Sequence, residues 1–198
     1  MIIPIINQKG GVGKTTTSVN LACGLSSGNK KTLLIDIDPQ AHTTFAFGIN
    51  KPEKTISHVL EGSISIASAV VQINPSLFLI ASSIRLAICS ERLYASAFRE
   101  EILKTHLDKI KSTYDYILLD SPPALGVLVN NIIYASDFII IPCEVSIYAL
   151  VGMGDLIHAI KTIKRDPNFS QFKVLITKID SRNKTSNKAA RQKVNEQK

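Results

Sequence analysis

The sequence NQKGGVGKTTT, residues 7–17, decides how the rest of the chain is interpreted. Its second half fits the phosphate-loop pattern G-x-x-x-x-G-K-[ST], in which glycines let backbone N–H groups curl around phosphate oxygens. Its first half departs from that pattern, because Gln8 stands where the first glycine belongs and a second lysine, Lys9, follows it. The stretch therefore predicts a phosphate-binding loop with one lysine more than the pattern requires.

The residue types of this loop predict its contacts with a nucleotide. We expect Lys14 to reach the β- and γ-phosphates and the Thr15 hydroxyl to bind Mg²⁺. A helix that begins near Lys14 would add its positive N-terminal end. A flexible glycine turn is the alternative, but the order strand, loop, G-K-T and helix argues against it. The residues expected to line the nucleotide are Lys9, Gly10, Gly11, Val12, Gly13, Lys14, Thr15 and Thr16.

Strand and helix patterns alternate along the chain. Strands are expected at residues 2–7, 32–36, 77–81, 116–120, 138–142 and 173–179. Helices are expected at residues 14–26, 55–60, 65–71, 126–135 and 149–164, with one or two more across 91–112. This alternation predicts an α/β fold, a largely parallel, twisted sheet with helices on both faces. We expect one P-loop domain over residues 1–180, followed by a basic polar segment, 181–198. Pro4 is expected to mark a strand start or a bulge.

Three of the expected strands end in residues that carry chemistry. The first runs into the glycine loop, the second ends at Asp36 and Asp38, and the fourth ends at Asp120. In parallel sheets ligands bind beyond the carboxyl ends of the strands. Asp120 could hold Mg²⁺, and one of the other two carboxylates could orient an attacking water. Each aspartate taken alone is also typical of a cap or turn.

Composition limits the class of protein. Apolar residues make up 45% of the 198 residues and charged residues 20%, a balance typical of a globular protein. The longest apolar stretches have strand length, so we expect no membrane span, and the N-terminus shows no basic leader of a secretory signal. Three scattered cysteines, Cys23, Cys89 and Cys143, show no metal or disulfide spacing. We therefore expect a cytoplasmic protein with three buried thiols.

Positive charge is concentrated near the C-terminus. The net charge is +7, and residues 161–198 hold eleven Lys and Arg against three acidic residues. A neutral body with a basic end favours a polyanionic partner. A solvated basic tail is the simpler alternative.

Four motifs together resemble one superfamily. KGGVGKTTT (9–17), LLIDIDPQA (33–41), YDYILLDSPPALG (114–126) and IIIPCE…YALVG (139–152) are similar to the ParA/MinD superfamily of deviant Walker-A ATPases, and most of all to Soj-type ParA proteins. The resemblance runs from residue 1 to about residue 184. Members usually continue further, so we expect this chain to be short at its C-terminus relative to the family.

The resemblance implies ATP and Mg²⁺ as cofactors, and Lys9, Lys14 and Asp38 as catalytic residues. It implies that Lys9 reaches across a nucleotide-sandwich homodimer to the phosphates of the partner subunit. Asp38, rather than Asp36, would position the hydrolytic water. Thr15 and Asp120 would bind the magnesium ion. ATP would then act as a switch, because it binds the dimer better than the monomer.

The resemblance also implies partners and a location. Soj-like proteins bind DNA without sequence preference, and Arg182 and Lys184 match or adjoin their basic DNA-binding position. Lys178, Lys188 and Arg191 could add to this patch. A ParB-like partner would stimulate a weak ATPase that acts in chromosome or plasmid partitioning. The protein would be cytoplasmic and nucleoid-associated, with no membrane partner.

Three other functions stay open. A MinD-like membrane switch needs an amphipathic C-terminal helix, but Val194 is the only sizeable apolar residue in 185–198. An iron–sulfur carrier of the superfamily needs a cysteine pair whose spacing is missing here. A truncated regulatory paralogue that caps full-length dimers, without full ATPase activity, would account for a short C-terminus.

Overall fold

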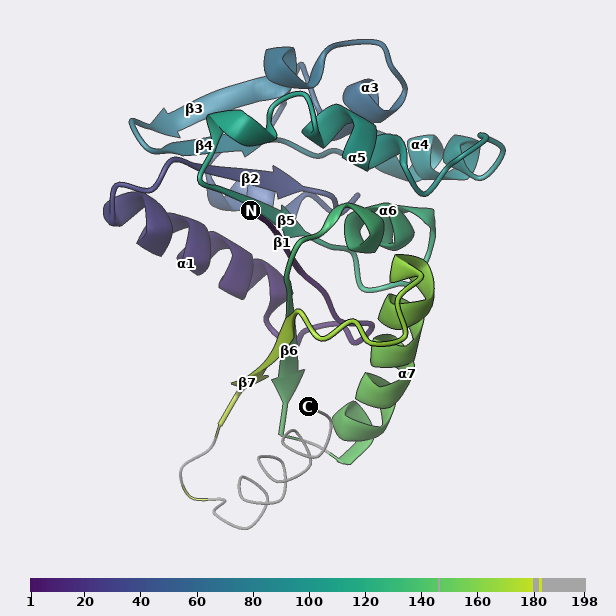
Figure 1. Cartoon of the computed structure of the whole chain (residues 1–198). Coiled ribbons are helices and arrows are strands. Elements are labelled where there is room, and N and C mark those ends of the chain that lie inside the picture. Colours follow the sequence, from purple (N-terminus) through teal and green to yellow (C-terminus); the bar gives the residue numbers. More distant parts are fainter. Residues whose placement is uncertain (146, 180–181, 183–198) are drawn as a thin grey trace.

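The computed structural model describes residues 1–145, 147–179 and 182. Within them the chain forms a seven-stranded sheet with the strand order β3-β4-β2-β5-β1-β6-β7 (Figure 1). All neighbouring strands are parallel except β3 and β4, which confirms the predicted largely parallel sheet. The strands are β1 (Ile2–Ile5), β2 (Thr32–Asp36), β3 (Val70–Asn74), β4 (Leu77–Ile80), β5 (Tyr116–Asp120), β6 (Ile139–Glu144) and β7 (Phe172–Thr177).

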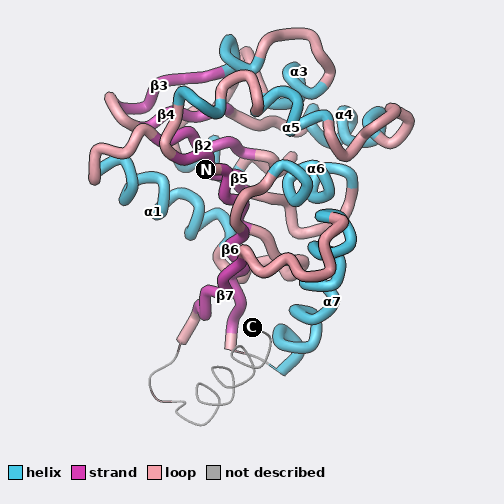
Figure 2. Tube along the Cα trace, viewed as in Figure 1, coloured by secondary structure: helices cyan, strands magenta, loops and turns pink. Residues whose placement is uncertain are grey.

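Helices cover both faces of this sheet. Figure 2 shows α1 on one side of the strands and α6 and α7 on the other. The helices of the described residues are α1 (Lys14–Ser27), α2 (His42–Ala46), α3 (Ile56–Leu60), α4 (Arg85–Leu93), α5 (Ile102–Leu107), α6 (Val127–Ala135) and α7 (Ile147–Lys164), with single 3₁₀ turns at Ile66–Ala69 and Lys111–Thr113. None of them is long and apolar enough to cross a membrane.

Two hydrophobic cores form because the strand side chains alternate between the faces. On β2, Leu33 and Ile35 belong to the larger core, together with residues of α3 to α7. Leu34 belongs to the smaller core, where Ala22 of α1 packs against it. Every residue of β2 is buried, as the continuous apolar run TLLID predicts for a strand covered on both faces.

The topology brings the chemistry-bearing strand ends together. Strands β2, β5 and β1 are neighbours, and Asp36 is in register with Asp120 across the parallel pair β2 and β5. The glycine loop leaves the end of β1 beside them. The predicted gathering of loop and carboxylates at one edge of the sheet is therefore confirmed.

One local prediction was wrong, and two others were incomplete. The helix expected at 65–71 is a 3₁₀ turn followed by β3, an antiparallel edge strand whose residues are mostly exposed. Two helices were among the alternatives for residues 91–112, and they are present as α4 and α5, although α4 begins earlier than predicted, at Arg85. The helix α2 was not expected, because Asp38 and Pro39 predict a turn. The turn is present, and Ala41 adopts a left-handed conformation with φ of 56° before the chain enters α2.

Pro4 lies inside β1, in register with Leu119, and neither begins the strand nor forms a bulge. Ile2 and Ile6 form their hydrogen bonds on the β6 side, so alternation turns the Pro4 nitrogen to that side too. There β1 and β6 pair only at Ile5 and Ile140. A missing donor at Pro4 is tolerated because the β6 ladder is short at this point.

Cys89 and Cys143 are buried, as expected, whereas Cys23 is exposed on α1, so the prediction of three buried thiols was wrong. Of the expected C-terminal segment, 181–198, the structure describes only Arg182. Lys184, Lys188 and Arg191 lie outside the described residues.

Candidate nucleotide-binding site

A cleft of about 370 Å³ opens at the carboxyl end of the sheet. The glycine loop, the start of α1 and the segment that follows β2 line this cleft. Its lining residues are Gly10, Gly11, Gly13, Lys14, Thr15, Thr16, Asp38, Gln40, His42 and Pro123. Six predicted nucleotide-binding residues and Asp38 therefore lie around one cavity. Val12 also belongs to the loop, but it is fully buried and does not line the cleft.

The loop owes its shape to glycines and to anchors at the ends of β6 and β7. Gly11 and Gly13 have φ values of 72° and 94°, where a side chain would be strained. The Thr177 hydroxyl donates to the Val12 carbonyl at 2.9 Å, and the Asn7 side-chain amide donates to the Pro142 carbonyl at 2.6 Å. Helix α1 then begins with no acidic residue in its first turn and no side-chain cap, which leaves its N-terminus suited to an anion.

Lys14 is a nearly buried cation at the base of this cleft. Its exposed fraction is 7%, and its ammonium donates to the Lys9 carbonyl at 3.2 Å. Burial lowers the pKa of Lys14, although Asp120 and Asp38 act in the opposite direction. A buried ammonium is costly unless an anion accompanies it. The site therefore favours a bound polyanion such as a nucleotide phosphate chain.

Asp120 is fully buried, and its carboxylate accepts hydrogen bonds from three side-chain hydroxyl groups. Thr15 and Thr43 donate to its Oδ2 at 2.8 and 2.7 Å, and Ser18 donates to its Oδ1 at 3.0 Å. Burial raises the pKa of Asp120, while these hydrogen bonds act against that rise. The predicted pairing of Thr15 with Asp120 is present in the geometry, but Thr43 and Ser18 were not anticipated.

The two aspartates after β2 have different surroundings. Asp36 has no exposed surface, and its oxygens accept bonds from the Asp38 amide and from the amide and hydroxyl of Thr44. Burial raises its pKa to about 6. Asp38 keeps 8% of its surface exposed and lines the cleft, where its Oδ1 accepts the Gln40 amide at 2.9 Å. Only Asp38 is thus placed to act on something in the cleft.

The oxygen atoms at this site suit magnesium. Mg²⁺ takes few protein ligands and completes its shell with water and phosphate oxygens. Thr15 Oγ1 and Asp120 Oδ2 already lie 2.8 Å apart beside the phosphate loop. No group of three His, Cys, Asp or Glu side chains able to enclose a metal occurs among the described residues. A two-ligand magnesium site at Thr15 and Asp120 fits this arrangement better than a closed protein cage.

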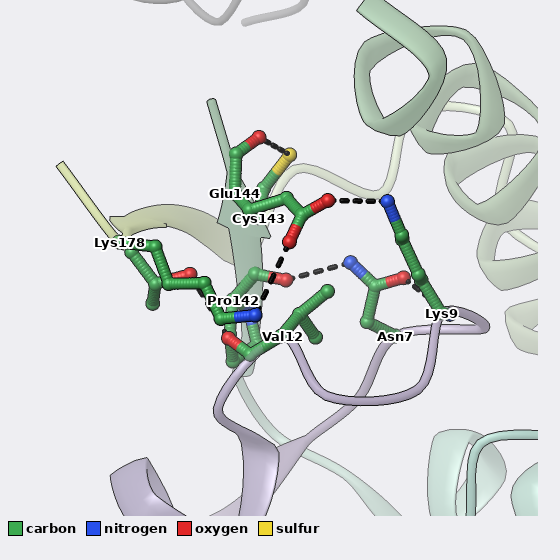
Figure 3. Close-up of polar contacts among 8 residues, drawn as sticks. Asn7, Lys9, Val12, Pro142, Cys143, Glu144 and Lys178 are labelled. Atoms are coloured by element: carbon green, nitrogen blue, oxygen red, sulfur yellow. Dashed lines mark hydrogen bonds and ion pairs between the residues drawn. The ribbon is translucent and has the colours of Figure 1, made fainter. Parts of the chain in front are cut away.

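Lys9 and Lys14 lie differently in the same loop. Lys9 does not line the cleft, and 46% of its side chain is exposed. Its ammonium forms an ion pair with Glu144 at the end of β6, a partner that sequence patterns did not reveal (Figure 3). Glu144 also pairs with Lys178 at 3.4 Å. One lysine therefore belongs to the molecule's own cleft and the other to its surface.

Arg182, predicted to contact DNA, lies in a turn beyond the end of β7, whereas Lys184 lies outside the described residues. Lys178 directly follows β7 and adopts a left-handed conformation with φ of 54°. Lys9 thus belongs to the phosphate loop, whereas Lys178 and Arg182 both follow β7 in the chain.

A family model described as an AAA domain matches residues 1–174. The sporulation initiation inhibitor protein Soj of Bacillus subtilis is 39% identical to this chain over 186 residues, which are 91% of this chain and 74% of Soj. The chain belongs to the Soj/ParA family of P-loop ATPases. The chromosome partitioning protein ParA of Myxococcus xanthus is 36% identical to it and is covered over 66% of its length, so this Soj/ParA chain is shorter than both relatives.

Solved structures agree with this assignment to the Soj/ParA family. A plasmid partition protein from Borrelia burgdorferi is similar with a TM-score of 0.85 and 31% identity, over 96% of this chain and 86% of that one. A Mycobacterium smegmatis protein described as cobyrinic acid a,c-diamide synthase, solved with an ATP analogue and magnesium, gives a TM-score of 0.88 at 31% identity, over 96% and 80% of the two chains.

Proposed function

We propose that this protein is an ATP-switched partitioning ATPase that binds DNA without sequence preference as an ATP-bound homodimer. It would act in chromosome or plasmid partitioning with a ParB-like partner that stimulates slow hydrolysis of ATP. The observation that carries the proposal is the separation of two lysines in one phosphate loop. Lys14 is buried in the cleft of its own subunit, whereas the Lys9 side chain lies at the surface, where a second subunit could contact it.

Within one subunit, the loop amides and the Lys14 ammonium would bind the phosphates. A bound Mg²⁺ would neutralise phosphate charge and orient the transferred group. Thr15 and Asp120 are its proposed ligands, and Ser18 and Thr43 keep the Asp120 carboxylate turned toward Thr15 through hydrogen bonds of 3.0 and 2.7 Å. Asp38 would orient the attacking water from the rim of the cleft, since phosphoryl transfer depends mainly on positioning and on charge neutralisation.

Between subunits, Lys9 would sense the nucleotide of the partner. An ammonium close to the terminal phosphate gains more from a triphosphate than from a diphosphate. ATP would favour the dimer over the monomer for this reason, and hydrolysis would reverse the preference.

DNA binding would belong to the basic region that begins at β7. Arg182 and Lys184 are the proposed contacts, and their partners would be backbone phosphates. A contact of this kind carries no base sequence, and salt weakens it because binding releases condensed counterions.

Retention on duplex DNA of arbitrary sequence tests the proposal. The protein should be retained with ATP and Mg²⁺, and released by ADP or by added salt. Lys14→Ala should abolish nucleotide binding and with it retention, whereas Asp38→Ala should keep the protein on DNA after wild-type protein has hydrolysed its ATP. Arg182→Ala should weaken retention without affecting the dimer. Equal retention with ATP and ADP would contradict the switch, and pelleting with ATP on anionic liposomes but not on DNA would favour a membrane role.

A further inference from the structure

Glu144, the last residue of β6, shares its carboxylate between two lysines of different elements. Its Oε1 pairs with the ammonium of Lys9 in the phosphate loop, and its Oε2 lies 3.4 Å from the ammonium of Lys178, which follows β7 (Figure 3). The hydrogen bond from Lys9 is the main reason that the pKa of Glu144 is below its ordinary value. The carboxylate is therefore charged at neutral pH and holds both cations at once.

The shape of the loop does not depend on the Lys9 side chain. The Lys9 amide donates to Asn7 Oδ1 at 2.9 Å, and the Asn7 side chain binds the Pro142 carbonyl. Thr177 holds the Val12 carbonyl on the other side of the loop. Since these contacts use the backbone and other side chains, the Lys9 ammonium can leave Glu144 while the loop keeps its anchors.

We propose that Glu144 is an intramolecular hold on Lys9, which keeps this lysine on its own subunit until the phosphates of a second subunit displace the carboxylate. The proposal rests on the role of Lys9 in the proposed ATP dimer. Lys178 makes release easier, because Glu144 stays paired with one cation after Lys9 has left. The contact thus sets a threshold for dimer formation.

The threshold is modest by its physical nature. The side chains of Lys9, Glu144 and Lys178 are 46%, 19% and 57% exposed, so solvent and salt screen the pair. Exposed ion pairs of this kind change an equilibrium by about two- to fivefold. The contact between Glu144 and Lys9 therefore weakens the dimer without preventing its formation.

The test measures the dimer dissociation constant by sedimentation, with a non-hydrolysable ATP analogue and Mg²⁺ at fixed salt and without DNA. Glu144→Gln should tighten the dimer by about two- to fivefold, because it frees Lys9. Lys178→Met should act in the opposite direction, because Glu144 then pairs with Lys9 alone. Glu61→Gln is the matched control, since Glu61 is also shared by two cations, Arg85 and Arg92, but lies on another part of the molecule.

Two outcomes would overturn the hold. One is an unchanged or weaker dimer in Glu144→Gln. The other is a change in the ADP affinity of the Glu144→Gln monomer that accompanies the change in the dimer, because that would assign Glu144 to the shape of the loop. Lys9→Ala separates this proposal from the proposed function. If Lys9→Ala dimerises like wild type, the function itself fails; if Lys9→Ala stays monomeric and Glu144→Gln equals wild type, only the hold fails.

Discussion

Thr43 donates its hydroxyl proton to the same oxygen of Asp120 that accepts the hydroxyl of Thr15, at 2.7 and 2.8 Å. Thr43 is fully buried and belongs to α2, whereas Thr15 belongs to the phosphate loop and α1. If Thr15 turns to a magnesium ion, Asp120 loses one donor and keeps Thr43 and Ser18. Thr43 also lies five residues after Asp38, so the proposed metal ligand is joined to the segment that holds the proposed water-positioning residue.

Thr43→Val should weaken magnesium-dependent nucleotide binding. It removes a hydrogen bond to a buried carboxylate, which corresponds to about 1–3 kcal/mol and thus to about a 5- to 150-fold change in apparent Mg²⁺ affinity. Titration of Mg²⁺ against the fluorescence of a labelled ATP analogue measures this change. Thr43→Ser should restore most of the affinity, because it keeps the hydroxyl.

Thr44 supplies the matched control for that experiment. It is equally buried and adjacent in sequence, but its hydroxyl donates to Asp36 and accepts the Ser82 amide. Thr44→Val should lower the free energy of unfolding and leave the Mg²⁺ midpoint of the folded protein nearly unchanged. Similar Mg²⁺ midpoints for both valine variants would remove the special role of Thr43.

The buried carboxylate of Asp36 should make folding stability depend on pH. Burial raises its pKa in the folded protein from 3.8 to about 6, so the folded state binds this proton more tightly than the unfolded state does. The associated stability is fully present below about pH 4 and is lost as the pH rises through 6. Asp36→Asn should therefore gain stability over wild type between pH 4 and pH 7, by up to about 3 kcal/mol.

Urea unfolding across that pH range measures the difference between Asp36→Asn and wild type. Asp108→Asn serves as a control of opposite sign, because hydrogen bonds from Lys104 and Lys111 lower the pKa of Asp108. A constant difference for Asp36→Asn at all pH values would show that the carboxylate is not perturbed as described.

Much of this site could be predicted from sequence because its parts are local. The glycines, Lys14 and Thr15 form one continuous motif, and the aspartates end strands that are recognisable as apolar runs. Strands β2, β5 and β1 place these ends together by topology alone. Parallel sheets with this pattern collect chemistry at their carboxyl ends, so the predicted edge was correct.

The residues that were missed act through contacts distant in sequence. Thr43 meets Asp120 across 77 positions, and Glu144 meets Lys9 across 135. Thr43 lies a few residues after the turn expected at Asp38 and Pro39, in a segment for which no element was predicted, so nothing in the sequence indicated a buried hydroxyl there. The strand β3 was missed, and its first two residues were included in the helix expected at 65–71, because β3 is short and lies at an edge, where its mostly exposed side chains show no alternation.

Gly13→Ala should destabilise the fold, whereas Gly10→Ala should not. Gly13 has a φ of 94°, which costs a residue with a side chain about 1–3 kcal/mol, even though the nearest atom to a new Cβ, Thr177 Cγ2, is 3.8 Å away. An added Cβ at Gly10 meets nothing within 4 Å. Denaturant unfolding of both variants compares the two positions. Equal stability would mean that the loop does not require the observed backbone at Gly13.

Asn131→Ala should cost stability at the contact between α5 and α6. The Asn131 side chain accepts the Leu103 amide at 2.9 Å and donates to the carbonyls of Arg99 and Val127. Loss of the bond to Leu103 leaves a buried amide of the first turn of α5 without a partner, which costs about 1–3 kcal/mol. Thermal unfolding should show a lower midpoint for Asn131→Ala than for Asn130→Ala, whose side chain is only half-buried. Identical midpoints would contradict this account of the helix pair.

Light scattering on the purified protein can decide whether Lys9 senses a phosphate held by a second copy. We expect the molar mass to double with a non-hydrolysable ATP analogue and Mg²⁺, and to stay that of one chain with ADP. Lys9→Ala should bind the analogue through Lys14 and remain a single chain in both cases. A wild-type protein with the same mass in both nucleotide states, or a Lys9→Ala variant that doubles in mass like wild type, would contradict the account.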